Sequence, residues 1–328
     1  MISKSIELLE SLRHENGLFS ASNSNKTGYK LAWIRDNIYE AIGLESVDIF
    51  KAIQTYHSIL NILLKHEYKI DHAIKQKPEH SYQYIHARYD PNNLNEIYEP
   101  WGNKQNDAIG LFLFKIADLL DNKINILRNE DDKRIIQKLI NYLETIEYWN
   151  DQDNGIWEEY EEVHASSVGA CLAALIKISK YFEVKQKLID KGKESLNNLL
   201  PNESITKDVD LALLTLIWPF NIVTEEQRNK ILNNAEGKLL RNKGVIRYVG
   251  DKYYNNGKEA EWTMGLTFLA LIYKELKNFD KYRYFLQRTI NVLNENGELP
   301  ELYYGESKEH NENSPLGWSQ SLLIVALN

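Results

Sequence analysis

Amphipathic helical patterns account for most of this chain. Apolar residues recur with the 3.6-residue spacing of an α-helix along twelve segments. These segments are 2–14, 32–43, 47–66, 104–121, 129–149, 164–182, 184–199, 207–218, 224–239, 259–276, 278–294 and 315–327. Short β-like stretches such as 245–249 fit only in the connections and are too short to build a sheet. The sequence therefore predicts an all-α fold.

The connections between these helices alternate in length and content. Mostly short connections precede the odd-numbered helices, whereas long ones, which hold most of the tryptophans, precede the even-numbered helices. If successive helices run antiparallel, every even-numbered helix begins at the same end of the molecule. This predicts an (α/α)6 barrel of six helical hairpins, formed by residues 1–328 as one domain. An open α-solenoid is the alternative, but the sequence lacks the fixed-period repeat of solenoid families.

Charge and composition narrow the classes of partner. The formal net charge is −8 without a long basic block, which argues against nucleic acid or an anionic membrane as a partner. The N-terminal segment has charges every few residues, and no apolar run approaches the roughly 18 residues that span a bilayer. The one cysteine, Cys171, lies in an apolar helical pattern, as expected of a core thiol in a reducing compartment. We therefore predict a soluble cytoplasmic protein, and any protein partner stays unknown.

The stretch from Asp153 to Ser167, DNGIWEEYEEVHASS, is the densest functional signal in the chain. A turn sequence precedes a tryptophan and a run of carboxylates, and a helical pattern follows. Loops at the mouth of a helix often carry catalytic groups. The alternative is a solvated acidic run that favours a helix N-terminus.

The predicted rim combines aromatic, cationic and acidic side chains. Flat aromatic rings bury the apolar faces of sugars, while charged groups bind sugar hydroxyls through charge-assisted hydrogen bonds. The candidate substrate-binding residues are Trp33, Arg35, Asp36, Trp101, Gln105, Asp107, Trp157, Glu159, Arg247, Trp262 and Trp318. This mixture suits a small, neutral carbohydrate ligand.

Cleavage of a glycosidic bond needs two carboxyl groups on opposite sides of the sugar. Glu158 and Glu301 come from loops in different halves of the chain and can meet this requirement, whereas the neighbours Glu158 and Glu159 cannot readily face each other. The eight histidines include no HExxH motif, and no phosphate-binding or serine-hydrolase motif occurs. We therefore predict no metal and no cofactor.

Several short motifs occur in order along nearly the whole chain from Trp33. They are WIRDN (33–37), WGNKQND (101–107), GIWEE (155–159), HASSVG (164–169), LLPNESITKDVD (199–210), EW (261–262), LPELYYG (299–305) and GWSQSLLI (317–324). Each is weak alone, but together they resemble the glucoamylase-like domain of glycoside hydrolase family 15. Within that superfamily the likeness is greatest to the regulatory alpha and beta subunits of phosphorylase kinase.

The resemblance implies an (α/α)6 barrel and inverting exo-hydrolysis of α-glucosides with release of β-glucose. It makes Glu158 the general acid and Glu301 the general base. Arg35 and Asp36 match the pair that holds the innermost glucose, Glu159 a substrate-contacting carboxylate, and Trp101 a pocket wall. Arg247 is a less secure match to a second substrate arginine, because the spacing of its loop is loose.

Two departures from the family pattern bear on activity. Starch-binding and β-sandwich domains are absent, which favours soluble malto- or isomalto-oligosaccharides over starch granules. The kinase subunits replace the second glutamate of WEE, whereas this chain keeps Glu159, which favours a working enzyme. The alternatives are a non-catalytic carbohydrate-sensing module and a trehalose hydrolase. For an enzyme, burial against Trp157 and the Glu159 charge should raise the pKa of Glu158.

Overall fold

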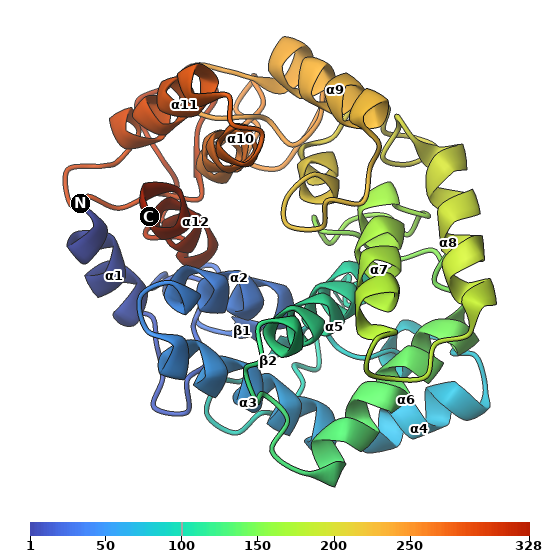
Figure 1. Cartoon of the computed structure of the whole chain (residues 1–328). Helices are drawn as coiled ribbons and strands as arrows, with labels where there is room; N and C mark the ends of the chain where they lie inside the picture. Colours follow the sequence, from blue (N-terminus) through green and yellow to red (C-terminus); the bar gives the residue numbers. More distant parts are fainter. Residues whose placement is uncertain (100) are drawn as a thin grey trace.

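A closed inner ring of helices organises the molecule. The computed structural model describes residues 1–99 and 101–328. Each inner helix packs against the next, and the last packs against the first (Figure 1). The ring consists of α2 (Ile34–Glu45), α5 (Asn106–Asp121), α7 (Ala165–Ile178), the 3₁₀-helix η2 (Leu211–Leu216), α10 (Thr263–Glu275) and α12 (Gly317–Leu327). These correspond to the six even-numbered helices of the sequence prediction.

An outer layer of amphipathic helices covers this ring. It comprises α1 (Ile2–Glu10), α3 (Ile49–Lys65), α4 (Glu67–Lys75), α6 (Glu130–Ile146), α8 (Gln186–Leu199), α9 (Glu225–Asn234) and α11 (Phe279–Asn291). Inner helices such as α7 are buried almost along their whole length, whereas outer helices such as α6 bury one stripe. The two layers form the predicted (α/α)6 toroid. No helix of residues 1–99 or 101–328 is both long and apolar enough to span a membrane.

Small residues allow the inner helices to pack closely. A Cβ atom at Gly110 of α5 would lie 2.6 Å from the backbone carbonyl carbon of Ala170 on α7, so a larger side chain would push these helices apart.

Polar caps fix the ends of outer helices. The Asn129 side chain accepts hydrogen bonds from the backbone N–H groups of Asp131 and Asp132 at the start of α6.

The structure corrects three features of the predicted helix pattern. Residues 207–218 form only the short 3₁₀-helix η2, which Asp210 caps and after which Pro219 stops further helix. The segment 67–75, predicted to be part of a connection, is α4, and it follows α3 with only His66 between them. The segment 224–239 is α9 followed by a π-helix (Ala235–Leu239).

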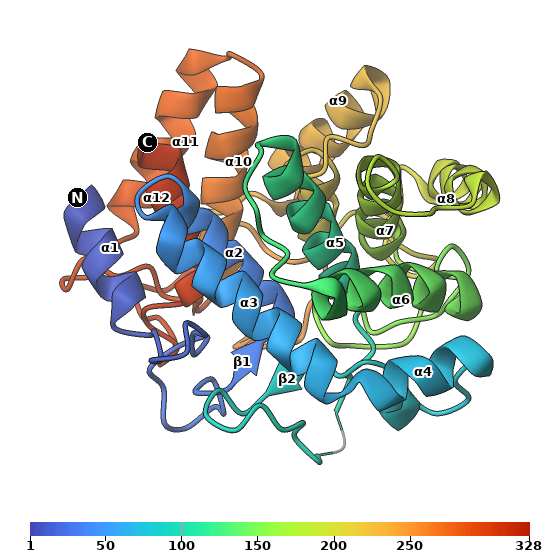
Figure 2. The same cartoon turned by 60° about the horizontal axis from the view of Figure 1, so that its bottom comes forward.

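Two-residue strands fix the rim at which the inner helices begin. β1 (Ala32–Trp33) pairs antiparallel with β2 (Arg88–Tyr89), and β3 (Glu261–Trp262) pairs antiparallel with β4 (Leu302–Tyr303). Helices α2 and α10 therefore begin two and four residues later than predicted. Figure 2 shows β1, β2 and the connection from α4 to α5 at the lower end of the barrel. The strands tie the sequence segments of the candidate site to one another.

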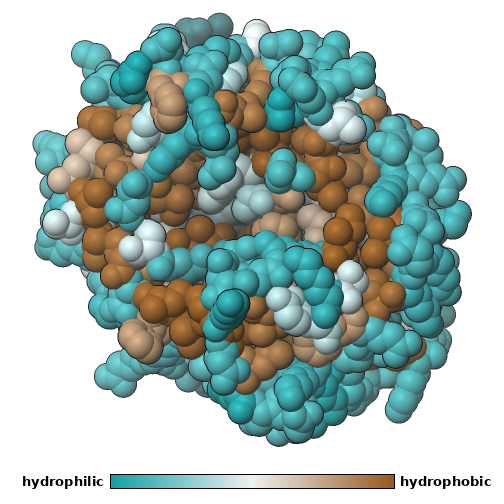
Figure 3. Space-filling model, viewed as in Figure 1, coloured by the Kyte–Doolittle hydropathy of each residue, from teal (hydrophilic) through white to brown (hydrophobic). Residues whose placement is uncertain are grey.

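An aromatic cluster fills the barrel axis below this rim. Tyr39 stacks on Trp318 with 4.5 Å between ring centroids, and Phe268 lies edge-on to both rings. Trp218 extends the cluster towards the opposite end, where a cavity of about 610 Å³ opens. Figure 3 shows the surface at that end, where apolar residues surround a central hollow. The cluster separates this hollow from the cavity at the rim.

Candidate active site

A cavity of about 400 Å³ opens at the rim where the inner helices begin. Eleven of the thirteen predicted site residues line it, namely Trp33, Arg35, Asp36, Trp101, Trp157, Glu158, Glu159, Arg247, Trp262, Glu301 and Trp318. Gln105 and Asp107 do not line it and instead contact Arg35 from behind. The structure therefore brings together residues from segments more than 280 positions apart in the sequence.

Arg35 is the centre of one side of the cavity. Its Nη1 donates to Oε1 of Gln105 at 2.7 Å and to Oδ2 of Asp107 at 3.4 Å, and its Nη2 donates to Oε1 of Glu158 at 3.2 Å. Oδ2 of Asp36 lies 3.8 Å from Nη2. The guanidinium is buried, so one cation is shared by three carboxyl groups.

The shortage of positive charge affects the protonation of these carboxyls. Removal from water raises the pKa of Glu158 to about 7; Arg35 opposes this rise and the Asp36 carboxylate adds to it. Burial likewise raises the pKa of Asp36 to about 6. The pKa of Glu158 is thus raised, as predicted, but Asp36 rather than Glu159 supplies the neighbouring negative charge.

The backbone explains why Glu158 and Glu159 differ. Glu158 has a φ of 61°, an unusual left-handed conformation for a residue other than glycine. A Cβ atom at Gly102 would lie 2.9 Å from the Glu158 carbonyl oxygen, so glycine allows the two loops to approach. The tight turn places consecutive carboxyl groups in different surroundings.

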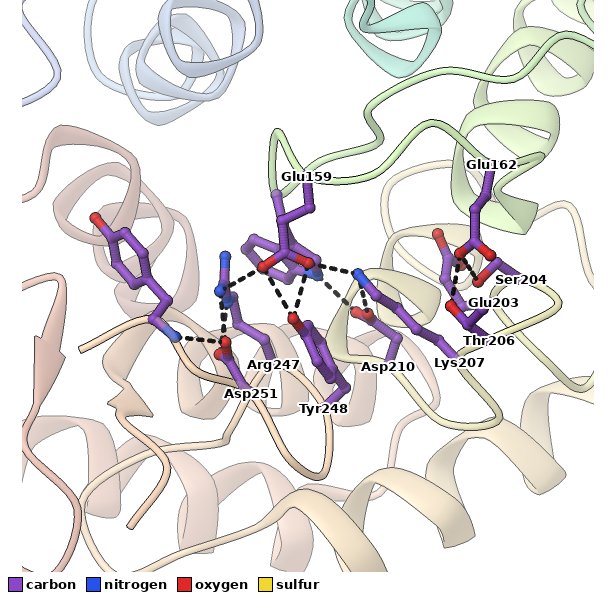
Figure 4. A network of polar contacts seen from close by, with 12 residues as sticks. Glu159, Glu162, Glu203, Ser204, Thr206, Lys207, Asp210, Arg247, Tyr248 and Asp251 are labelled. Atoms are coloured by element: carbon purple, nitrogen blue, oxygen red, sulfur yellow. Dashed lines mark hydrogen bonds and ion pairs between the residues drawn. The ribbon is translucent and has the colours of Figure 1, made fainter. Parts of the chain in front are cut away.

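Glu159 is held by three protein partners (Figure 4). Its carboxylate accepts hydrogen bonds from Arg247 and Lys207 at 2.8 Å each and from the Tyr248 hydroxyl. Burial acts to raise its pKa, but Arg247 and Lys207 outweigh burial and lower the pKa below its ordinary value. Glu159 is therefore an anion that fixes Arg247, which Asp251 also holds through two hydrogen bonds.

Glu301 lies on another side of the cavity, and its side-chain hydrogen-bond donors among residues 1–99 and 101–328 are neutral. Its Oε1 accepts from the Tyr29 hydroxyl at 2.7 Å, and its Oε2 accepts from Nδ2 of Asn313 at 2.8 Å and from Nδ2 of Asn311. Only 1% of the residue is exposed, and burial raises the pKa of its carboxyl, while these hydrogen bonds act in the opposite direction. Both oxygens are thus arranged as acceptors.

Tryptophans form the walls of the cavity. Trp33 and Trp101 meet edge to face, and the Arg88 guanidinium lies 4.4 Å from the ring centroid of Trp101. Trp157 packs against Trp262 with 5.3 Å between centroids. These rings offer the flat apolar surfaces that sugar binding requires.

Two of the sequence motifs support the wall rather than line it. Nε1 of Trp157 donates to Oδ1 of Asp210 at 2.7 Å, which fixes the plane of the indole. Within the HASSVG motif, Ser166 donates to Glu203 and Ser167 donates to Asp153. These buried contacts hold the loop that carries Glu158.

Sequence reasoning missed several residues of the site. Tyr29, Arg88 and Tyr253 line the cavity, and Asn311 and Asn313 bind Glu301. Tyr29 precedes the WIRDN motif by only four residues, and the two asparagines stand between LPELYYG and GWSQSLLI. Their proximity to these motifs was the available signal.

The closed helical barrel with an acidic, tryptophan-walled pocket at one rim defines a glucoamylase-like (α/α)6 protein. The family model described as glycosyl hydrolases family 15 matches residues 3–260. The chain belongs to this family.

Known relatives and structures fall into two groups. The probable phosphorylase b kinase regulatory subunit alpha of Caenorhabditis elegans is 26% identical, over 95% of this chain and 32% of its own length. The chain thus spans about a third of the length of the curated relatives it matches. A glycosidase in complex with glucose has a TM-score of 0.84 at 16% identity and covers 99% of this chain and 96% of its own. The glucoamylase of Saccharomycopsis fibuligera has a TM-score of 0.71 at 16% identity, covering 99% of this chain and 94% of its own. The likeness to solved structures shows a shared fold.

Proposed function

We propose that residues 1–328 are one catalytic domain that hydrolyses soluble α-glucosides from the non-reducing end and releases β-glucose. In this proposal Glu158 is the general acid and Glu301 is the general base. The observation that carries it is the contrast between the two carboxyls that line one cavity. Glu158 shares one cation with two other carboxyls, and its pKa is about 7, whereas Glu301 accepts hydrogen bonds at both oxygens.

The proposed reaction follows from these states. Protonated Glu158 donates its proton to the glycosidic oxygen as the bond from this oxygen to the anomeric carbon breaks. A water molecule attacks the anomeric carbon from the opposite face and transfers a proton to ionised Glu301. The configuration inverts, and an α-glucoside yields β-glucose. An inverting pair needs roughly 6.5–9.5 Å between carboxyl groups to admit this water.

The remaining residues bind the sugar in this proposal. Arg35 and Asp36 contact the hydroxyls of the innermost glucose, and the tryptophan walls cover its apolar faces. Arg247 supplies a further donor, and Glu159 fixes its guanidinium. Gln105 and Asp107 support Arg35 from behind.

Following the anomer of released glucose by NMR tests the proposal. The substrates are maltose, maltotriose, isomaltose, dextrin and trehalose, and the proteins are the wild type, Glu301→Gln and, as a matched control in the same loop, Glu309→Gln. We expect β-glucose from the wild type and from the control. In Glu301→Gln we expect the rate of glucose release to fall about 10²–10⁴-fold. Release of α-glucose, or an unaffected Glu301→Gln variant, contradicts the proposed roles. The preferred substrate identifies the linkage, including the α,α-1,1 linkage of trehalose.

A carbohydrate-sensing or regulatory module is the second candidate. The observation in its favour is that the curated relatives are described as kinase regulatory subunits. Both candidates predict sugar binding, which calorimetry with the same substrates measures, but only the enzyme predicts turnover. Measurable binding without turnover of any substrate favours the regulatory module.

A further inference from the structure

A second cavity, of about 610 Å³, opens at the end of the barrel opposite the candidate active site. This far cavity lies in the central hollow of Figure 3. The helices α2, α5, α7 and α10 end around it, and α9 and the segment after η2 complete its wall. Among the residues that the structure describes, none lines both cavities, and the aromatic cluster on the barrel axis stands between them. The far cavity is therefore a separate space.

Trp218 gives the far cavity a flat aromatic surface. Its indole is only partly buried, and it packs against Phe268 with 5.9 Å between ring centroids and against Tyr39 with 6.4 Å. Further apolar side chains line the cavity, namely Ile42, Phe114, Ile217, Ile272 and Leu276. Because Phe268 and Tyr39 hold the indole in place, the part that lines the cavity is a fixed surface on which one face of a sugar ring can pack.

The charged groups on the α5 side of the far cavity are paired with one another. Nζ of the buried Lys115 donates to Oε2 of Glu45 at 2.9 Å and to Oδ2 of Asp118 at 2.7 Å. Lys177 also donates to Asp118. An ammonium group has three donors, so Lys115 keeps one for a further acceptor. The two cations and two carboxylates balance, and this side gives little attraction to an ion.

The polar groups on the α9 and α10 side have fewer partners. Nε of Arg228 is buried and has no hydrogen-bond acceptor within residues 1–99 and 101–328, and its Nη2 lies 3.5 Å from the exposed Glu225. Glu275 is exposed, and its carboxylate forms no ion pair in the same part of the chain. A buried donor without an acceptor is unfavourable, and a ligand oxygen would satisfy it. Arg228 and Glu275 also offset each other in charge.

The lining as a whole favours a ligand without net charge. Its three cations match its three carboxylates, so neither a phosphate nor an amine finds an excess of opposite charge. Hydroxyl groups both donate and accept hydrogen bonds, which suits an arginine donor in a cavity with carboxylate acceptors. The volume lies within the roughly 300–1,000 Å³ typical of small-molecule sites. A monosaccharide, which has an apolar ring face and hydroxyl edges, meets all three conditions.

We propose that the far cavity binds a neutral monosaccharide such as glucose, at a site separate from the one at the rim. One face of the sugar ring packs on Trp218. One hydroxyl oxygen accepts from Nε of Arg228, and another hydroxyl group donates to Glu275. This binding requires no turnover, so it goes beyond the proposed function and can stand where that function fails.

NMR signals of the tryptophan indole N–H groups can locate bound glucose. Five of the seven tryptophans line the central cavity, Trp218 lines the far cavity and Trp149 lines neither. Replacement of single tryptophans by phenylalanine assigns the signals. We expect the Trp218 signal to shift saturably as glucose is added, while the Trp149 signal stays in place. Mannitol, an acyclic polyol without a ring face, is the ligand control and should shift the Trp218 signal much less.

A double variant tests the polar contacts of the far cavity. Arg228→Ala/Glu275→Ala should abolish the glucose-dependent shift of the Trp218 signal and leave the response of the five central signals as in the wild type. Unchanged central signals without sugar show that the variant is folded. The matched control, Glu226→Ala/Lys230→Ala, removes one carboxylate and one cation from exposed positions of α9 that do not line the cavity, and it should keep the shift.

The outcomes distinguish this site from the one at the rim. A Trp218 signal that does not respond to glucose, that responds equally to mannitol, or that still responds in the double variant overturns the far site. If the Trp218 shift is present and is lost in the double variant, while none of the five central signals responds to glucose, the far site stands. Sugar binding in the central cavity, on which the proposed function depends, then fails.

Discussion

The two sides of the central cavity hold their carboxyls by different means. On the Arg35 side, one buried guanidinium faces Asp36, Asp107 and Glu158. On the Glu301 side there is one carboxyl, and its donors are a phenol and two amides. Burial raises the pKa of Glu158 to about 7 despite the shared Arg35, whereas at Glu301 the donors aimed at both oxygens oppose the rise in pKa that burial causes and favour the ionised carboxyl. If Glu158 is the acid and Glu301 the base, as proposed, their roles are set by their hydrogen-bond and charge partners rather than by residue type.

A substrate with a different leaving group should give the largest difference between the effects of replacing Glu158 and Glu301. Fluoride leaves α-glucosyl fluoride with little need for a proton, so Glu158→Gln should hydrolyse this substrate within about tenfold of the wild-type rate. With maltose, the hydrolysis rate of the same variant should fall about 10²–10⁴-fold. The rate of Glu301→Gln should fall by about the same factor with both substrates. Steady-state kinetics of the two variants provides the measurement. Equal losses of Glu158→Gln on both substrates would show that it does not act as the acid.

Removal of the shared cation should destabilise the Arg35 side. Arg35→Met leaves buried carboxylates without a partner, and we expect it to lower the free energy of unfolding by about 3–5 kcal/mol at pH 8. The loss should be smaller at pH 5, where Asp36 and Glu158, with pKa values of about 6 and 7, take up protons. Urea unfolding at both pH values measures the effect. Arg134→Met removes exposed ion pairs with Glu67 and Asp131 and should leave the free energy of unfolding nearly unchanged at either pH.

Loss of one donor should change only the Glu301 side. Tyr29→Phe removes the hydrogen bond to Oε1, so the pKa of Glu301 rises further, and activity is lost at higher pH as the solution is acidified. We expect the acidic limb of kcat/KM to move up by about one pH unit, with the basic limb of Glu158 unchanged. Tyr253→Phe is the control, because its hydroxyl contacts Tyr29 and is not bonded to Glu301. A shift of both limbs in Tyr29→Phe would contradict the separate roles.

The raised pKa of Glu158 should also appear in stability. Because its pKa is about 7 in the folded state and near 4.5 when unfolded, its favourable contribution is full below pH 4.5 and is lost as pH rises through 7. Glu158→Gln lacks this dependence. We expect it to be more stable than wild type at pH 8 by on the order of 1 kcal/mol, and at most about 3 kcal/mol, with a smaller difference at pH 5. Thermal unfolding at the two pH values checks this, and an equal difference at both would refute it.

Much of the fold was predictable because tryptophan-containing motifs precede or open five of the six ring elements, η2 being the exception. Alternation of long and short connections identified all six ring positions. The errors arose where local pattern and tertiary context disagree. Residues 211–218 are almost all apolar and resemble the continuation of a helix, but Pro219 and the Asp210 cap leave only a 3₁₀-helix. Pairing of β1 with β2 joins residues more than 50 positions apart and leaves no local signal.

The candidate site shows the same limit. Trp33, Arg35 and Glu158 stand in short motifs, so their placement at the rim followed from the helix pattern. The contacts of Glu159 could not be predicted from the helix pattern, because its partners Lys207 and Tyr248 come from other loops. Asn311 and Asn313 were missed for the same reason, since an asparagine in a polar loop has no distinctive pattern until its hydrogen bonds are known.

The aromatic cluster below the pocket has a consequence for the order of turnover. Tyr39, Trp318 and Phe268 close the barrel axis, so whatever enters at the rim also leaves there. Under the proposed reaction, the shortened chain departs first because it lies between the freed glucose and the solvent. The glucose is bound deepest and departs last. It must leave before another chain can bind. Accumulating glucose would then compete with incoming substrate, and the pace of the cycle would depend on emptying the pocket as well as on breaking the bond.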